Sequence, residues 1–220
     1  MNTKEYLSIR EELQAQQVAL VAVSKTKPVE AIQEAYQLGQ RIFGENRALE
    51  LRDKYEVLPK DIEWHMIGHL QTNKVKYIAP FVHLIHSIDK ISLLKEVNKR
   101  AAQNNRVIDV LIQVHIAEEA SKHGFDETEL FQLLQETNLE TLPNINIIGL
   151  MGMATFTSDQ DQVKQEFQHL QRLFEQVKTT AFEAKEDFNV LSMGMSGDYL
   201  TAIQQGSNMV RLGSIIFGAR

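Results

Sequence analysis

The sequence alternates short apolar runs with segments of helical periodicity, eight times in succession. The apolar runs cover residues 19–25, 41–46, 62–68, 84–89, 109–116, 144–154, 188–196 and 208–218. Most are continuously apolar, which is typical of strands buried on both faces. Eight such units predict an α/β protein with a closed (β/α)8 barrel of the TIM type. An open doubly wound sheet is the alternative, but no glycine-rich fingerprint follows the first strand.

The remaining organisation is simple. Helical spacing over about residues 3–17 predicts an extra helix before the first strand. There is no linker or low-complexity segment, so we expect one domain over residues 1–220. The N-terminus lacks the apolar core of a signal peptide, and no apolar run approaches the roughly 20 residues of a membrane span. We expect a cytoplasmic protein without membrane contact.

Composition excludes several functional classes. The net charge is −6 and there is no basic stripe, which argues against nucleic-acid binding. The chain has no cysteine, so disulfides, thiolate nucleophiles and cysteine–zinc sites are excluded. His65 and His69 are four apart and His83 and His86 three apart, but these pairs fall on strands or strand ends. Such spacings suggest a metal on a helix with a third ligand, so we expect no metal site.

The residue of most interest is Lys25, at the end of the first apolar run. In barrels of this type the chemistry lies at the carboxyl ends of the strands. Alternation along the strand puts Lys25 on the side of Val21 and Val23, which predicts an amine pointing into the mouth. Lys27 shares this parity, and a nearby like charge with partial desolvation favours the neutral amine that forms Schiff bases. A solvated lysine at a strand end is the alternative.

Two turns near the end of the sequence are candidates for phosphate binding. Ser196 and Gly197 follow the seventh strand, and Gly213 and Ser214 belong to the eighth. Backbone N–H groups at such turns bind phosphate, often after strands seven and eight of a barrel, although ordinary turns are the alternative for each motif. In a closed barrel the eighth strand lies beside the first, so a phosphate there would lie near Lys25. Pyridoxal 5′-phosphate combines the required aldehyde and phosphate.

Six motifs make the sequence resemble a known family. In chain order they are AVSKTKP, FGENR, WHMIGHLQTNK, GLMGMA, LSMGMSGDY and VRLGSIIFGAR. They resemble the YggS/PROSC family of pyridoxal-phosphate homeostasis proteins over nearly the whole chain. The resemblance implies a barrel like the N-terminal domain of alanine racemase and a cofactor held as a Schiff base. It also implies intracellular homeostasis of the cofactor, by holding, buffering or delivering it, without established turnover.

The resemblance also implies roles for individual residues. Lys25 resembles the Schiff-base lysine. Arg211 resembles the arginine that faces the pyridine nitrogen, and Asn46 and His65 match positions that line the pocket. The implied phosphate cup consists of Ser196, Gly197, Gly213 and Ser214.

The segment after the fifth strand departs from the family pattern. This chain has His115 where asparagine is usual and His123 where a small residue is usual, whereas Lys122 and Gly124 keep their places. The contacts of this segment therefore need not follow the family.

Arg211 bears on what the cofactor would do. A guanidinium is always charged and cannot accept a proton, so it disfavours a protonated pyridine nitrogen and weakens carbanion stabilisation. An ion pair inside the barrel, with Glu45 as a partner, is the alternative interpretation of Arg211.

Two enzymatic functions are the alternatives to a binding protein. A racemase needs acid/base groups on both faces of the substrate carbon. The chain is expected to end after the eighth strand without a second domain, and Tyr199, the tyrosine nearest the mouth, is expected on a helix surface. A Schiff-base aldolase needs a carboxylate at the mouth, for which Glu45 is the obvious candidate. We therefore expect binding without turnover, with apo-enzymes as candidate recipients and a monomer, or alternatively a dimer.

Overall fold

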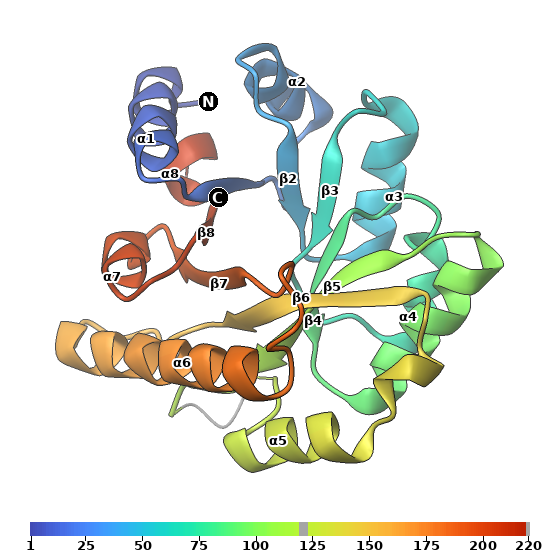
Figure 1. Ribbon diagram of the computed structural model, residues 1–220. Helices are drawn as coiled ribbons and strands as arrows, with labels where there is room; N and C mark the ends of the chain where they lie inside the picture. Colours follow the sequence, from blue (N-terminus) through green and yellow to red (C-terminus); the bar gives the residue numbers. More distant parts are fainter. Residues whose placement is uncertain (119–122, 219–220) are drawn as a thin grey trace.

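Parallel strands form a closed barrel in which the first strand pairs with the last (Figure 1). The structure, a computed structural model, describes residues 1–118 and 123–218, so Lys122 lies outside the described residues. The described strands are β1 (Ala19–Val23), β2 (Ile42–Glu45), β3 (Glu63–Met66), β4 (Leu84–Ile88), β5 (Ile108–Val114), β6 (Ile145–Gly152), β7 (Val190–Met195) and β8 (Met209–Leu212). The predicted (β/α)8 barrel is confirmed.

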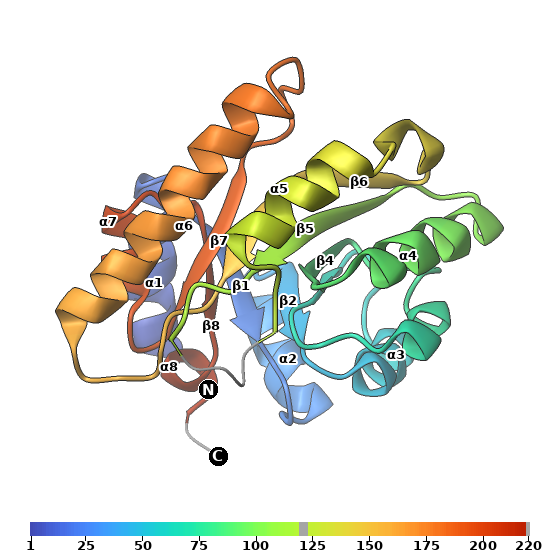
Figure 2. The same ribbon diagram turned by 90° about the horizontal axis from the view of Figure 1, so that it is seen from below.

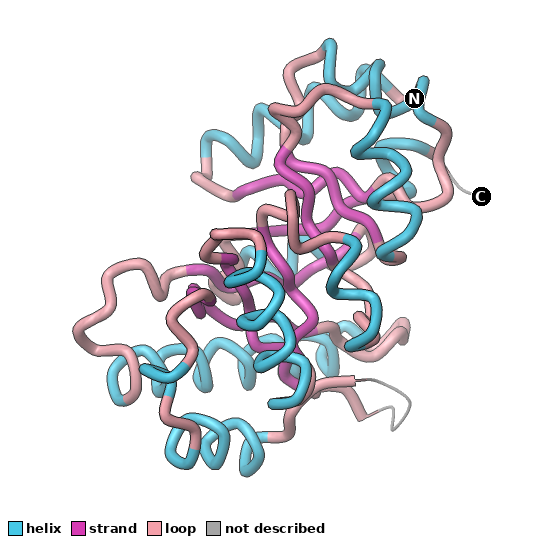
Figure 3. The backbone as a smooth tube through the Cα atoms, turned by 90° about the vertical axis from the view of Figure 1, so that its right-hand side faces the viewer, coloured by secondary structure: helices cyan, strands magenta, loops and turns pink. Residues whose placement is uncertain are grey.

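Helices surround this barrel (Figure 3), and α3 to α6 follow one another along its outside in Figure 2. The described helices are α1 (Thr3–Ala15), α2 (Val29–Gln37), α3 (Ala48–Val57), η1 (Thr72–Tyr77), α4 (Ile91–Gln103), α5 (Glu127–Glu136), η2 (Leu139–Thr141), α6 (Gln160–Thr180), α7 (Tyr199–Gln204) and α8 (Ser214–Phe217). The predicted N-terminal helix is thus present as α1. Within residues 1–118 and 123–218, no helix has the length and apolar character needed to cross a membrane.

The alternation of side chains along each strand creates two apolar layers. On β1, Val21 joins a cluster inside the barrel, whereas Leu20 and Ala22 join the layer between strands and helices. The other buried members of the inner cluster are Leu84, Leu111, Met151 and Met209. This parity identifies which residues further along each strand face the interior.

Two segments differ from their predicted structure. Residues 71–81, where helical periodicity predicts a helix broken near Pro80, form only the 3₁₀ helix η1, because Thr72 and Asn73 are weak helix formers. Residues 208–218, predicted as one strand, leave the sheet at Gly213 and continue as α8.

The early end of β8 allows α8 to pack beside α1 (Figure 1). The backbone N–H of Asn2, just before α1, donates to the carbonyl of Ile216 at 2.9 Å. Tyr6, Ile9 and Leu13 form the buried face of α1 at helical spacing. The N-terminal helix therefore covers the outside of the barrel where the first and last strands meet.

Gly194 provides a test of how α7 and the turn before it are positioned. Its φ is +98°, and a Cβ there would lie 2.6 Å from the Cβ of Ala202 on α7. We predict that Gly194→Ala lowers the free energy of unfolding by about 1–3 kcal/mol, because it combines overpacking with backbone strain. Urea unfolding measures the loss. Gly197→Ala is the matched control, since its Cβ would meet nothing within 4 Å; equal losses in the two variants would contradict the prediction.

Candidate functional site

Lys25 lies in a turn at the carboxyl end of β1. The strand itself ends at Val23, and Thr26 has a φ of +64°, so the strand alternation does not continue through the turn. Lys25 is half-buried, whereas Ser24 before it is fully buried. The predicted inward parity of Lys27 is therefore wrong. Its ammonium group instead donates to the carbonyls of residues 217 and 218, at 3.1 and 3.0 Å.

A buried ionic cluster on the α3 side of this turn holds it in place. Nζ of Lys54, on α3, lies 2.7 Å from Oε1 of Glu45 and donates to the carbonyl of Ser24 at 2.8 Å. The Ser24 hydroxyl donates to the same Glu45 oxygen at 2.6 Å. Burial raises the pKa of Glu45, and the nearby Lys54 ammonium opposes that shift. Removing one member of such a buried pair typically costs about 3–5 kcal/mol, so the cluster fixes the backbone before Lys25.

The other side of the turn is also held. Glu50, on α3, accepts a hydrogen bond from the backbone N–H of Thr26 at 2.6 Å. Nζ of Lys54 donates to the same Glu50 oxygen at 2.8 Å. The backbones of Ser24 and Thr26, on either side of Lys25, are thus both hydrogen-bonded to side chains of α3.

Glu45 does not lie in the mouth of the barrel. A Cβ at Gly44 would lie 2.8 Å from Val21 of the inner cluster, so Gly44 faces the interior and Glu45 faces α3. The prediction that Glu45 is a mouth carboxylate, and the alternative in which it pairs with Arg211, are both wrong. Tyr199 is likewise neither at the mouth nor on the surface: it is 9% exposed and belongs to the outer apolar layer.

The turns after β7 and β8 meet each other beside the end of β1. The backbone N–H of Gly213 donates to the hydroxyl of Ser196 at 3.2 Å. A Cβ at Gly213 would lie 3.2 Å from the carbonyl oxygen of Val23, two residues before Lys25. Gly197 and Ser214 are exposed in the same turns, and the space beside Gly197 is open. The structure therefore brings the predicted cup residues to the end of the strand that precedes Lys25.

Arg211 lies inside the barrel at the end of a hydrogen-bonded chain. It is the β8 partner of Val21, and it is 3% exposed. Its guanidinium donates to the Ser192 hydroxyl at 2.6 Å and to the carbonyl of Gly152 at 3.0 Å. Nδ1 of His86 lies 3.1 Å from the Ser192 oxygen, and Nε2 of His86 lies 3.0 Å from Nδ1 of His65. This series of hydrogen bonds crosses the barrel interior from β8 through β7 and β4 to β3.

The charge of Arg211 determines which group donates and which accepts in each of these hydrogen bonds. Arginine only donates, so the Ser192 oxygen accepts from Arg211 and its hydroxyl hydrogen can donate to Nδ1 of His86. His86 then carries its proton on Nε2 and donates to Nδ1 of His65, which leaves the proton of His65 on Nε2. In the reverse direction, the Nδ1–H of His86 and the guanidinium of Arg211 would both donate to the Ser192 oxygen, and the hydrogen bonds of the described residues offer its hydroxyl hydrogen no acceptor. Burial lowers the pKa of His65 to about 3 and that of His86 well below its usual value, so both rings are neutral.

Asn46 lies at the rim, directly after β2. It is half-buried, and its Oδ1 is buried without a hydrogen-bond partner in the described structure. A Cβ at Gly68 would lie 2.6 Å from the Cβ of Asn46, so a glycine is required where the chain after β3 passes it. Asn46 therefore presents an unused acceptor at the mouth.

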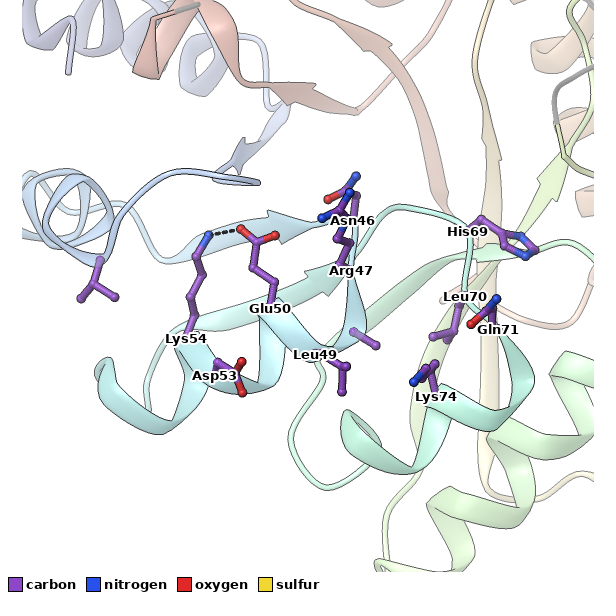
Figure 4. Close-up of a pocket in the computed structure, with 12 residues that line it drawn as sticks. Asn46, Arg47, Leu49, Glu50, Asp53, Lys54, His69, Leu70, Gln71 and Lys74 are labelled. Carbon is purple, nitrogen blue, oxygen red and sulfur yellow. Dashed lines mark hydrogen bonds and ion pairs between the residues drawn. The ribbon is translucent and has the colours of Figure 1, made fainter. Parts of the chain in front are cut away.

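A groove of about 740 Å³ lies beside the mouth, on the α3 side of the Lys25 turn, and is lined in part by Glu50 and Lys54, which hold that turn (Figure 4). Neither Lys25 nor the β7 and β8 turns line it, although Asn46 does. Figure 4 shows that the ring of His69 points away from Asn46 and from the rest of the groove. We locate the candidate site at the convergence of β1, β7 and β8 because the turn that bears Lys25 adjoins the turns that contain the predicted cup residues.

Known proteins resemble this chain over most of its length. Residues 3–220 match the family described as "Alanine racemase, N-terminal domain". The pyridoxal phosphate homeostasis protein of Aquifex aeolicus is 43% identical over 206 residues, which cover 91% of this chain and 86% of that protein. The human protein of that name is 38% identical, over 95% of this chain and 79% of its own. The chain belongs to the family of pyridoxal phosphate homeostasis proteins.

A solved structure adds to this membership. PipY of Synechococcus elongatus, solved with PLP bound, has a TM-score of 0.86 and 32% identity, covering 98% of this chain and 99% of that one. Alanine racemase of Bartonella henselae has a TM-score of 0.67 at 16% identity, over 99% of this chain and 60% of that one. At that identity the likeness concerns the fold alone.

Sequence reasoning missed Lys54, His86 and Ser192. Lys54 has the appearance of an ordinary surface residue on a helix, and no sequence signal distinguishes it. His86 and Ser192 did carry a signal, because each interrupts an apolar strand at an inward position. Only the closed barrel shows that these two side chains meet behind Arg211.

We predict that His65 and His86 stay neutral and carry their protons on Nε2 between pH 8 and 5. Long-range ¹H–¹⁵N correlation spectra of the ring nitrogens measure both properties. Unfolded histidines titrate near pH 6.5, so below this pH the unfolded state binds protons that the folded state does not bind. The histidines therefore lower the free energy of unfolding as the pH falls below about 6.5. A protonated ring at pH 6, or a proton on Nδ1 of His86, would contradict the assigned direction.

Proposed function

We propose that this chain binds pyridoxal 5′-phosphate at the mouth of the barrel and holds, buffers or delivers it. One observation carries the proposal: the hydrogen bond from Gly213 to Ser196 joins the β7 and β8 turns next to the end of β1. A phosphate in those turns would lie close to the amine of Lys25. Family membership and the PLP-bound PipY structure support the same ligand.

Lys25 is the residue that would hold the ligand covalently. Pyridoxal 5′-phosphate supplies an aldehyde that condenses with a primary amine, with loss of water, and a ring that withdraws electrons from the product. The backbone before and after Lys25 is tied to α3, so the amine starts from a defined position. Because Lys25 is half-buried, its amine can be partly desolvated and still be reached.

The phosphate would be held by hydroxyls and backbone N–H groups. Ser196 and Ser214 supply the hydroxyls, and Gly197 lies in open space where backbone can approach an anion. Gly213 already donates to Ser196, so its contribution is the close approach that its missing side chain allows. Charge-assisted hydrogen bonds of this kind contribute roughly 1.5–3 kcal/mol each.

Arg211, His65 and Asn46 would act on the ring. Arg211 is level with Val21, below Lys25 along β1, so the guanidinium can face the ring nitrogen from the interior. Burial lowers the pKa of Arg211 to about 10, which leaves it charged at neutral pH and disfavours a protonated ring nitrogen. His65 acts through the hydrogen-bonded chain, and Oδ1 of Asn46 offers an acceptor at the rim.

The same residues favour binding over turnover. Neither Glu45 nor Tyr199 is available as an acid/base group at the mouth, and Arg211 weakens the electron withdrawal that carbanion chemistry needs. We propose a carrier, acting as a monomer in the cytoplasm, with apo-enzymes that require the cofactor as recipients. A racemase-like enzyme is the alternative.

The phosphate cup makes a prediction about affinity. Pyridoxal, which lacks the phosphate, should bind at least about tenfold more weakly than pyridoxal 5′-phosphate, since 1.4 kcal/mol corresponds to a factor of ten. Ser196→Ala should lower the affinity for the phosphorylated ligand more than that for pyridoxal, and Ser92→Ala on the exposed face of α4 is the control. Absorbance titration measures both. Equal affinity for the two ligands would refute the cup.

A paired assay separates the carrier from the enzyme. We predict that the loaded protein activates an apo-enzyme faster than the same amount of free cofactor does. We also predict no multiple turnovers of L- or D-amino acids. Sustained racemisation or α-proton exchange that is lost in Lys25→Ala would favour the enzyme. Activation no faster than with free cofactor would remove delivery and leave buffering.

A further inference from the structure

Three segments bring metal-ligating side chains together at the carboxyl ends of β3, β4 and β5. His69 follows β3, Asp89 follows β4 and His123 lies after β5. Nδ1 of His69 lies 2.8 Å from Oδ2 of Asp89, and Nδ1 of His123 lies 3.8 Å from the same oxygen. The two rings stack with centroids 4.0 Å apart. All three ligand-type atoms lie within 4.8 Å of one another.

The carboxylate of this cluster has an unused oxygen. The side chain of Asp89 is only 6% exposed, and its Oδ1 is buried without a hydrogen-bond partner in the described structure. A buried carboxylate with an unsatisfied oxygen is costly unless a partner or a cation balances it. His69 and His123 remain 35% and 55% exposed, so an ion can reach the cluster from solvent.

We propose that His69, Asp89 and His123 bind a divalent transition-metal ion of the Zn²⁺ class. Two imidazole nitrogens and one carboxylate oxygen suit Zn²⁺, Co²⁺ or Fe²⁺, whereas Mg²⁺ and Ca²⁺ prefer sites built from oxygen. Three protein ligands leave coordination positions for water or for an oxygen of a bound molecule. The site lies across the mouth from β7, β8 and β1, and it does not depend on pyridoxal phosphate binding.

This inference revises the expectation of no metal site. That expectation rested on the spacing of histidine pairs, and spacing cannot show three segments that meet only in the folded barrel. His123, which follows β5, completes the set of three ligand-type side chains.

A second cluster, formed by Glu63, His65 and His83, is a weaker candidate. These residues also offer three ligand-type atoms within 4.8 Å. However, Nδ1 of His65 already accepts from His86, and the direction of that chain leaves a proton on Nε2 of His65. Neither nitrogen of His65 then has a free lone pair for a metal.

Metal titration of the chelator-treated protein tests the proposal without any cofactor. We expect one equivalent of Co²⁺ to produce visible d–d absorption, and Zn²⁺ but not Mg²⁺ to displace it. His123→Ala and Asp89→Asn should each lower the Co²⁺ affinity at least about 10-fold, because even outer partners of a metal ligand matter by 10–100-fold. His83→Ala removes the second cluster, and His169→Ala removes a histidine of α6 that lies 3.8 Å from Glu127; both should bind Co²⁺ as the parent chain does.

Two outcomes would overturn the proposal. One is equal Co²⁺ affinity in the parent chain and in His123→Ala, which would mean that His69 and Asp89 form only a hydrogen-bonded pair. The other is loss of binding in His83→Ala but not in His123→Ala, which would place the ion at the second cluster. His123 is more than half exposed, so its replacement leaves the fold intact even if Asp89→Asn does not fold.

Discussion

The pairing of β1 with β8 is the constraint on which the rest of the structure depends. It joins the first strand of the chain to the last, with Val21 opposite Arg211 and Ala22 opposite Leu212. The turn that bears Lys25 and the turn that begins at Gly213 thereby become neighbours. An open sheet with the same strands would leave Lys25 and the turns after β7 and β8 at opposite edges. The closure of the barrel is therefore also what creates the candidate site.

Inside the closed barrel, a buried cation must be compensated. Arg211 is held by a hydroxyl and a carbonyl, and its charge orients the two neutral histidines behind them. Outside the barrel wall, Lys54 and Glu45 form a second buried ionic group that fixes the turn before Lys25. The two groups lie on opposite faces of the sheet, as the alternation along β2 and β8 requires. Both lie beneath the mouth, and Lys54 of the second group holds the backbone of the turn that bears Lys25.

The sequence predicted the architecture because continuous apolar runs indicate strands buried on both faces, and eight of them indicate closure. The sequence was less informative where the orientation of a single residue decides which face of the sheet its side chain lies on. Glu45 stands at the end of a strand of four residues, and only the inward position of Gly44 shows that it faces α3. The early end of β8 at Gly213 and the 3₁₀ form of η1 depend on packing against α1 and on weak helix formers. Contacts between distant segments, such as His86 with Ser192 or His69 with His123, have no local signature.

The central claim is that closure places Lys25 as the residue that captures the aldehyde of pyridoxal 5′-phosphate. Borohydride reduction of the loaded protein, followed by peptide mass mapping, tests it most directly. The account predicts a pyridoxyl group on the peptide that contains Lys25, and no reducible absorbance band in Lys25→Ala, although that variant can retain some ligand through the phosphate cup. A label on Lys27 or Lys122, with Lys25 unmodified, would contradict it.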